Sequence, residues 1–413
     1  MAKDINNKKK KTKKRQKWTK LRHKIVQGIA YAILYPYSLL VYGVRIEKFK
    51  DKRKRPLLIL MNHQTAFDQF FLGMAFRQRA YYIASEDLFS KGFLSRVIRF
   101  LVAPIPIKKQ TNDASAVMTC ARVAREGATI ALAPEGNRTY SGRLVYIKPS
   151  IVGLVRLLRL PVVLYRIEGG YGVHPRWSDV VRKGKMRCYV SEVIEPEEYK
   201  QLSDDELLER IRKGLDVDET QIEGEYRHPR LAEYLERAMY VCPYCGLSEF
   251  ESNRDIIACK TCGRQIRYLP NKQLEGVGFD FPYLYVADWY EYQQEFVSKM
   301  AISGYDQIPI YKETAGLSEV ILYDRKRGIA PECEIAIYND RFALKYGENE
   351  MILPFDYVSA VTVLGKNKLD IYFEDKVYQL KGNKRFNALK YVNLFYHAQS
   401  VRKGEKDGEF LGL

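Results

Sequence analysis

The chain has 413 residues, an apolar content of 46% and a formal net charge of +18, so it is long enough for two or three domains and too apolar to be mainly disordered. Seven cysteines, four of them in two CxxC pairs, argue against a secreted disulfide framework and for metal binding in a reducing compartment. The positive charge is concentrated in residues 1–24, a basic tail with twelve Lys or Arg against the single acid Asp4. Such a tail binds polyanions, either nucleic acid or an anionic membrane.

An uncharged segment follows the basic tail. Residues 25–44 contain no charged side chain, and twenty helical residues span about 30 Å, enough to cross a bilayer core. Pro36, several tyrosines and basic residues on both flanks favour instead a kinked or re-entrant monotopic anchor with both ends in the cytoplasm; a single-pass anchor is the alternative. We therefore expect residues 25–55 to attach the protein to the cytoplasmic face of the cell membrane, without a cleavable signal peptide.

The next part of the chain, residues 56–222, alternates short apolar runs with helical patterns. This alternation predicts an α/β domain, in which a core sheet is flanked by helices and functional loops lie at strand ends. The expected strands are 57–61, 80–84, 129–133, 162–165 and 186–190, and the expected helices are 66–76, 94–102, 114–125, 151–159 and 204–213.

The first polar cluster comes directly after the strand predicted at residues 57–61. His63 is expected in the strand–helix turn, and Asp68 in the first helical turn, pointing back towards it. A carboxylate that holds an imidazole fixes its tautomer and raises its basicity, as general-base catalysis requires. Two structural interpretations compete with this one: Thr65 and Asp68 fit a helix capping box, and His63 is compatible with a hydrogen-bonded loop histidine.

The second polar cluster follows the strand predicted at residues 129–133. It consists of Glu135, Gly136, Asn137 and Arg138. The glycine lets the backbone approach a ligand closely, and the guanidinium offers a planar fork for a phosphate. Taken alone, the cluster favours a turn that carries a surface ion pair between Glu135 and Arg138.

Two shorter motifs complete a series of four. Residues 104–109 form a strand-like run that ends in Lys109, and Pro161 introduces the strand at residues 162–165. In order and spacing, the four blocks resemble those of the glycerolipid acyltransferase family, whose best-known members acylate lysophosphatidate (1-acylglycerol-3-phosphate). The resemblance covers residues 56–222, and its most specific parts are the His-x4-Asp block and the Pro-Glu-Gly-x-Arg block.

The resemblance implies a reaction in phospholipid biosynthesis. His63 would be the base and Asp68 its orienting partner, in a transfer from acyl-CoA or acyl-carrier protein to a lysophospholipid without a catalytic metal or an acyl-enzyme. Lys109 stands where the family usually has Arg, and Ala133 and Asn137 stand where it usually has Phe and Thr, which leaves the acceptor less defined than the reaction. The residues expected to bind the acceptor are Lys109, Glu135, Gly136, Asn137 and Arg138.

Four cysteines after this domain predict a metal site. Two CxxC knuckles, each followed by glycine, are typical of a tetrahedral zinc ribbon, here at residues 236–270. With four thiolates the zinc has no open coordination position, so its role is structural. The expected ligands are Cys242, Cys245, Cys259 and Cys262, and the three unpaired thiols are Cys120, Cys188 and Cys333.

The remaining sequence has three parts. Residues 216–230 are charged and weakly patterned, and predict a linker. Residues 279–300 are rich in tyrosine and end in a helical pattern, which predicts a connecting segment whose aromatic side chains pack between domains rather than against a membrane. Residues 305–401 contain short strand-like runs followed by a final helical pattern, an order that resembles a pleckstrin-homology-like barrel.

Two other functions compete with the enzyme. A basic tail beside a zinc ribbon also suits a nucleic-acid-binding protein, although the ordered blocks and the uncharged segment argue against it, and we expect no nucleic acid partner. A lipid-binding regulator, in which the C-terminal barrel recruits a non-catalytic acyltransferase domain, is the second alternative. The intact pair of His63 and Asp68 argues against that loss of activity.

Overall fold

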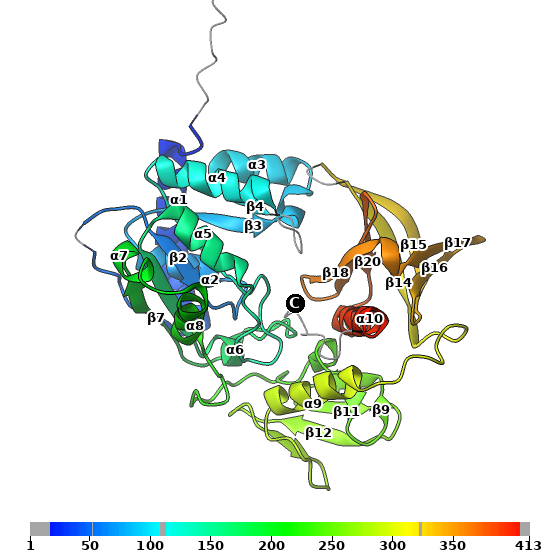
Figure 1. Ribbon diagram of the computed structural model, residues 1–413. Coiled ribbons are helices and arrows are strands. Elements are labelled where there is room, and N and C mark those ends of the chain that lie inside the picture. Colours follow the sequence, from blue (N-terminus) through cyan, green and yellow to red (C-terminus); the bar gives the residue numbers. More distant parts are fainter. Residues whose placement is uncertain (1–16, 52, 108–112, 322–323, 405–413) are drawn as a thin grey trace, which may run out of the picture.

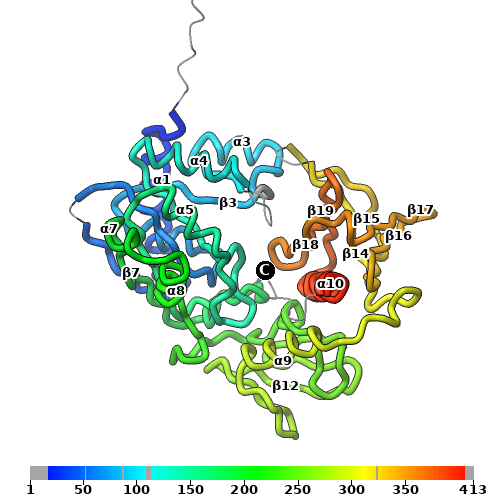
Figure 2. The backbone as a smooth tube through the Cα atoms, in the orientation of Figure 1, coloured from blue at the N-terminus to red at the C-terminus, as the bar shows by residue number. Residues whose placement is uncertain are grey.

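A computed structural model describes residues 17–51, 53–107, 113–321 and 324–404 (Figure 1). An N-terminal α/β domain, a small cysteine module and a C-terminal β domain follow one another along the chain (Figures 1 and 2). One of the residues expected to bind the acceptor, Lys109, lies outside the described residues.

The N-terminal domain is built on a seven-stranded sheet in the order β1-β7-β6-β2-β5-β3-β4. Neighbouring strands are parallel except for β6 and β7, which pair antiparallel. The central strand β2 is buried along its whole length, as expected of a strand that is covered on both faces. The strands are β1 (Val44–Ile46), β2 (Leu58–Met61), β3 (Ala80–Ser85), β4 (Ile105–Ile107), β5 (Thr129–Leu132), β6 (Val162–Glu168) and β7 (Met186–Ile194).

Helices cover both faces of this sheet. Apolar side chains of α4, α5 and α8 form one core with the sheet, and those of α1 and α2 form a second core on its other face. The predicted α/β fold, a core sheet flanked by helices, is therefore confirmed. The helices are α1 (Leu21–Tyr42), α2 (Asp68–Ala75), α3 (Phe93–Leu101), α4 (Ala114–Arg125), α5 (Ser150–Leu158), α6 (Gly170–Val173), α7 (Pro196–Tyr199) and α8 (Asp204–Leu215), with a 3-10 turn η1 (Glu86–Phe89).

The N-terminal helix α1 has its polar side chains turned inward. His23, Gln27 and Ser38 are buried against the domain, whereas most of its large aliphatic side chains face outward. The helix passes Pro36 without a break and meets α2 closely, since a Cβ added at Gly73 would lie 2.1 Å from the Tyr31 ring. By length and composition, α1 is apolar enough to cross a membrane.

Two features near the domain's ends differ from the predicted elements. Strand β1 belongs to the segment expected to form only the anchor, and it pairs with β7 at the sheet edge. Residues 216–230, expected to be a linker, form no helix or strand but are not an exposed tether. Tyr226 is completely buried, and the buried Glu219 lies 3.3 Å from the Lys272 ammonium. This segment therefore joins the domain to the cysteine module by packing.

The cysteine module is a set of short hairpins. Its main sheet has the order β10-β11-β12-β13, and a two-stranded ribbon of β8 and β9 lies beside it. The elements are η2 (Leu235–Arg237), β8 (Val241–Cys242), β9 (Gly246–Leu247), β10 (Phe250–Asn253), β11 (Ile256–Cys259), β12 (Gln265–Tyr268) and β13 (Leu274–Gly276).

The connecting helix α9 (Val286–Ser298) packs against this module. The Trp289 indole is completely buried, donates to the Val241 carbonyl over 2.9 Å and meets the rings of Phe250 and Phe281 edge to face. The aromatic residues of the tyrosine-rich segment therefore pack inside the protein, as their composition indicates.

The C-terminal domain is an antiparallel sheet in the order β17-β16-β15-β14-β20-β19-β18, closed by helix α10. The prediction of a mostly-β domain that ends in a helix is confirmed. Its apolar core is continuous with that of the cysteine module. The elements are β14 (Tyr311–Val320), β15 (Lys326–Ile337), β16 (Arg341–Tyr346), β17 (Asn349–Pro354), η3 (Phe355–Tyr357), β18 (Val358–Leu364), β19 (Lys368–Phe373), β20 (Lys376–Lys381) and α10 (Ala388–Lys403).

Candidate active site

His63 and Asp68 meet in the turn between β2 and α2. The His63 Nδ1 atom lies 2.8 Å from Asp68 Oδ2. The aspartate side chain is completely buried, whereas 24% of the histidine side chain is exposed. Because Nδ1 faces the carboxylate, Nε2 is the ring nitrogen that can exchange a proton with a substrate.

The Asp68 carboxylate has a second set of partners. It accepts hydrogen bonds from the backbone N–H groups of Gln64, over 2.7 Å, and Thr65, over 2.9 Å, and from the Thr65 hydroxyl, over 2.6 Å. These bonds supply only the Asp68 half of the expected capping box, because helix α2 begins at Asp68 with Phe67 as its N-cap and no side-chain capping hydrogen bond. A carboxylate fixed by these donors keeps its orientation towards the imidazole, which is what a base requires of its partner.

Two amide side chains beside His63 hold the turn in place. Asn62 spans to β6, donating to the Ile167 carbonyl over 2.9 Å and accepting from the Ile167 N–H over 2.7 Å. Gln64 accepts from the Tyr171 N–H over 3.0 Å. Neither amide was predicted to have a role. The sequence did contain a signal for this role, since both amides follow an apolar strand closely and polar side chains buried there need hydrogen-bond partners.

Glu135 joins the second polar cluster to the first. Its Oε1 accepts from the His63 N–H over 2.6 Å and its Oε2 accepts from the Val145 N–H over 3.0 Å. Burial raises the pKa of Glu135 to about 8, and these two donors act in the opposite direction. Gly136 has a φ of +72°, a left-handed conformation that favours glycine. The carboxylate therefore fixes the backbone of the base itself.

Arg138 is half-buried and has no carboxylate partner among the described residues. Within the described parts of the chain, no ion pair involves Arg138, and its Nη1 is buried without a hydrogen-bond partner. Glu135 is only 5% exposed, so the alternative of a surface turn with an ion pair between these two residues is wrong. Burial and, to a smaller extent, the neighbouring Arg176 lower the pKa of Arg138 to about 10. A guanidinium with a buried nitrogen that has no partner is suited to binding an anion.

Of the two remaining predicted motif residues, Asn137 lies beside Arg138 and Pro161 lies away from this cluster. Asn137 is buried beside Arg138, and its Oδ1 lies 3.4 Å from an Arg176 amine. Pro161 precedes β6, where its carbonyl accepts from the Leu58 N–H over 2.9 Å. Because β2 and β6 are parallel, this contact lies at the N-terminal ends of the strands, whereas His63 follows the C-terminal end of β2. The fourth motif therefore supports the sheet and does not reach His63.

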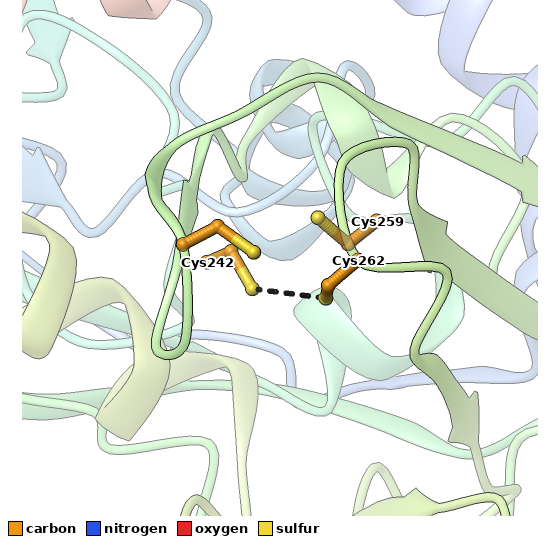
Figure 3. Close-up of side chains that lie close together, drawn as sticks. Cys242, Cys259 and Cys262 are labelled. Atoms are coloured by element: carbon orange, nitrogen blue, oxygen red, sulfur yellow. Dashed lines mark hydrogen bonds between the residues drawn. The ribbon is translucent and has the colours of Figure 1, made fainter.

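The four cysteines of the CxxC knuckles converge at one point, as Figure 3 shows for Cys242, Cys259 and Cys262. The four sulfur atoms lie within 4.8 Å of one another, and the Sγ atoms of Cys242 and Cys262 are 3.9 Å apart. A tetrahedral zinc with Zn–S bonds of about 2.3 Å places its sulfur ligands roughly 3.8 Å apart, so the cluster fits a metal of this kind. The other three thiols are buried and unpaired, as predicted.

Comparison with known proteins identifies the N-terminal domain. Residues 43–167 match the family model described as Acyltransferase. This range contains His63, Asp68 and the cluster of Glu135 to Arg138, so the predicted resemblance is confirmed and the chain carries an acyltransferase domain.

Two solved structures resemble parts of the chain. One is the crystal structure of the 1-acyl-sn-glycerophosphate (LPA) acyltransferase PlsC from Thermotoga maritima, with 19% identity and a TM-score of 0.37, covering 47% of this chain and 75% of that chain. The other is the solution structure of the N-terminal PH domain of the human ARAP2 protein, with 13% identity and a TM-score of 0.17, covering 22% of this chain and 81% of that chain. No curated protein matches the chain.

Proposed function

We propose that this acyltransferase domain transfers a fatty acyl group from a thioester, acyl-CoA or acyl-carrier protein, to the free hydroxyl of a lysophospholipid. The acceptor that best suits its charges is 1-acylglycerol-3-phosphate, which places the enzyme in phospholipid biosynthesis. The observation that carries the proposal is the His63–Asp68 pair, with 2.8 Å between Nδ1 and the carboxylate, inside a domain that matches the acyltransferase family.

The reaction needs one base and no covalent intermediate. Nε2 of His63 takes the proton from the acceptor hydroxyl, whose oxygen attacks the thioester carbonyl. The tetrahedral intermediate collapses with loss of the thiolate, which takes the proton back from Nε2 and leaves as a thiol. Asp68 stabilises the imidazolium that forms between these two steps. General-base catalysis of this kind accelerates a reaction by about 10²–10⁴-fold.

The second cluster is proposed to form the acceptor site. Arg138 pairs with the phosphate, and the Gly136 backbone and the Asn137 amide line the site beside it. Glu135 contributes indirectly, because both of its oxygen atoms already accept backbone hydrogen bonds. Lys109 is proposed to add a further positive charge, although it cannot provide the bidentate fork of an arginine.

A zinc ion held by Cys242, Cys245, Cys259 and Cys262 is proposed to have a structural role. Four thiolates fill its coordination sphere and leave no position for substrate. The ion would stabilise the module that connects the acyltransferase domain to the C-terminal domain.

The protein is proposed to act at the cytoplasmic face of a membrane. Besides the outward aliphatic side chains of α1, helix α3 exposes 78% of Phe93 and 57% of Phe100. The two helices are tied together by the Arg22 guanidinium, 3.7 Å above the Phe100 ring. The basic tail adds attraction to anionic lipid of about 1 kcal/mol for each residue near the surface.

Charges placed on the outer face of α1 are expected to weaken membrane binding. Ile29 and Ile33 are 58% and 66% exposed, and the double change to Asp should lower partitioning onto anionic vesicles at least tenfold, because two isoleucines lose apolar burial worth about 1.5–3 kcal/mol each. Vesicle flotation measures the bound fraction. The matched control is Ile308→Asp, which alters an equally exposed isoleucine (68%) outside this helix; equal losses in both variants would contradict the assignment.

A substrate panel tests the proposed reaction. Wild-type protein in vesicles is supplied with radiolabelled acyl-CoA or acyl-carrier protein and with lysophosphatidate, lysophosphatidylcholine or monoacylglycerol. We expect the fastest transfer to lysophosphatidate with at least one donor. Transfer only to the phosphate-free acceptor would contradict the proposed phosphate site, and transfer to none would contradict the reaction.

A further inference from the structure

Arg138 is not alone in having a buried nitrogen without a partner. His174, at the end of α6, is 8% exposed, and its Nε2 is also buried without a hydrogen-bond partner. Its Nδ1 lies 3.3 Å from the Tyr42 hydroxyl. In the tautomer that accepts the hydroxyl hydrogen at Nδ1, Nε2 carries a hydrogen and is a donor. In that tautomer, two buried donors on separate elements lack an acceptor, which a bound anion would supply.

The C-terminal domain adds a lysine ammonium to this junction. Figures 1 and 2 show β18 on the side of that domain which faces the acyltransferase domain. Lys366, in the turn between β18 and β19, donates to the Ser178 carbonyl over 2.6 Å and to Asp179 Oδ1 over 2.9 Å. An ammonium has three hydrogens, so one remains for a further partner.

Arg176 ties this turn to the acceptor cluster. It donates to the Arg138 carbonyl over 3.0 Å and to the Val363 carbonyl on β18 over 3.2 Å, and its guanidinium lies 4.3 Å from the centre of the Tyr140 ring. Arg176 is 3% exposed, and its guanidinium is already occupied by these two carbonyl groups. It is a positioning residue, because it sets the distance between Arg138 and the C-terminal domain.

Positive charge exceeds negative charge at the junction. Burial and, to a smaller extent, the charges of Lys366, Arg138 and Arg182 lower the pKa of His174 to about 3, so the positive charge at the junction belongs to Arg138, Arg176 and Lys366. The carboxylate of Asp179 already pairs with both Lys366 and Arg237. Within the described residues, no other acid forms an ion pair with Lys366, and none forms one with Arg138. The Asp68 carboxylate, which faces His63, acts on Arg138 and His174 in the direction that raises their pKa values. A dianionic group would restore the balance.

We propose that the phosphate of the acceptor binds at this junction, held by Arg138 Nη1, His174 Nε2 and Lys366 Nζ. The C-terminal domain thereby supplies part of the acceptor site of the acyltransferase domain. This inference rests on the proposed function for the identity of the acceptor, but the anion site itself rests on the unpartnered donors. It specifies a phosphomonoester as the group recognised, and it explains why the two domains are joined at the turn containing Lys366.

Two variants that each remove one charge distinguish phosphate binding by Lys366 from docking of the C-terminal domain. Lys366→Gln removes the proposed contact to phosphate, so the KM for lysophosphatidate should rise about tenfold or more, with kcat and the KM for monoacylglycerol nearly unchanged. Asp179→Asn weakens the same docking contact but leaves Lys366 charged and free of its competing anion. Its KM for lysophosphatidate should stay the same or fall. Lys366→Arg should largely restore the wild-type value.

The opposite outcomes would overturn the inference. If Lys366 serves only to dock the domains, both variants should raise the KM for lysophosphatidate and for monoacylglycerol alike. A separate binding test covers failure of the proposed reaction: glycerol 3-phosphate should raise the unfolding temperature of the full-length wild type and not that of Lys366→Gln. Equal shifts, or no shift in either protein, would show that the junction holds no phosphate, whatever the enzyme acylates.

Discussion

Replacing His63 by Ala is expected to reduce acyl transfer by about 10²–10⁴-fold, the usual contribution of a general base. In the proposed mechanism the imidazole receives the acceptor proton, and the side chain of Asp68 has no other histidine within hydrogen-bond distance among the described residues. Transfer from radiolabelled acyl-CoA and from acyl-carrier protein to lysophosphatidate, measured in vesicles at equal protein concentration, gives the rate ratio.

The matched control for this variant is His228→Ala. His228 also lies in a loop, and its Nδ1 accepts from the Arg230 N–H over 3.0 Å, so it tests the loss of an imidazole outside the active site. This control should keep the wild-type rate. His63→Ala should keep its zinc content and its membrane association. A wild-type rate in His63→Ala would contradict the mechanism and favour the alternative in which a non-catalytic domain serves as a lipid-binding regulator.

Removing one thiolate from the metal cluster is expected to destabilise the cysteine module and, with it, the docking of the C-terminal domain. Structural zinc sites of this type contribute about 10–16 kcal/mol of binding free energy to folding. Cys259 is 1% exposed and belongs to the core that the module shares with the C-terminal domain. Cys259→Ser should therefore lose bound zinc, lower the unfolding temperature and expose the C-terminal half to limited proteolysis.

Chemistry should fail in this variant only as a consequence of unfolding, because none of the four cysteines lies among the residues assigned to proton transfer. The matched control is Cys333→Ala, another cysteine that is 1% exposed, on β15 of the same core. It should retain its zinc, as measured by atomic absorption. A stable, zinc-free and fully active Cys259→Ser protein would contradict the structural role.

The proposed phosphate site links the loss of zinc in Cys259→Ser to the binding of the acceptor. We expect the loss of zinc to weaken the docking of the C-terminal domain, which would move Lys366 away from the acceptor site. A partly destabilised cysteine variant should therefore show a raised KM for lysophosphatidate before it loses activity towards monoacylglycerol. Such a sequence of losses is specific to a phosphate site that spans both domains.

The chemistry-bearing motifs were accessible from the sequence because they are local. His63 and Asp68 lie in one strand–turn–helix, where the chain cannot avoid bringing them near each other, and the Thr65 hydroxyl that donates to Asp68 belongs to the same turn. Each CxxC knuckle likewise presents two thiolates over a short stretch of chain, so ligand spacing alone indicated a metal site. Alternation of apolar runs and helical patterns predicted the α/β core for the same reason, since periodicity is a property of neighbouring residues.

The contacts that only the tertiary structure revealed join residues far apart in the chain. The role of Glu135 as a brace for His63 depends on a contact across 72 positions, and the contacts of Arg176 with β18 and of Lys366 with Asp179 each span 187 positions. No local pattern encodes such pairs, because burial and partner choice are set when separate domains pack together. The role proposed for His174 and Lys366 consequently has no signal in the sequence, because an isolated histidine and a lysine in a turn become candidates only when folding brings their segments to that of Arg138.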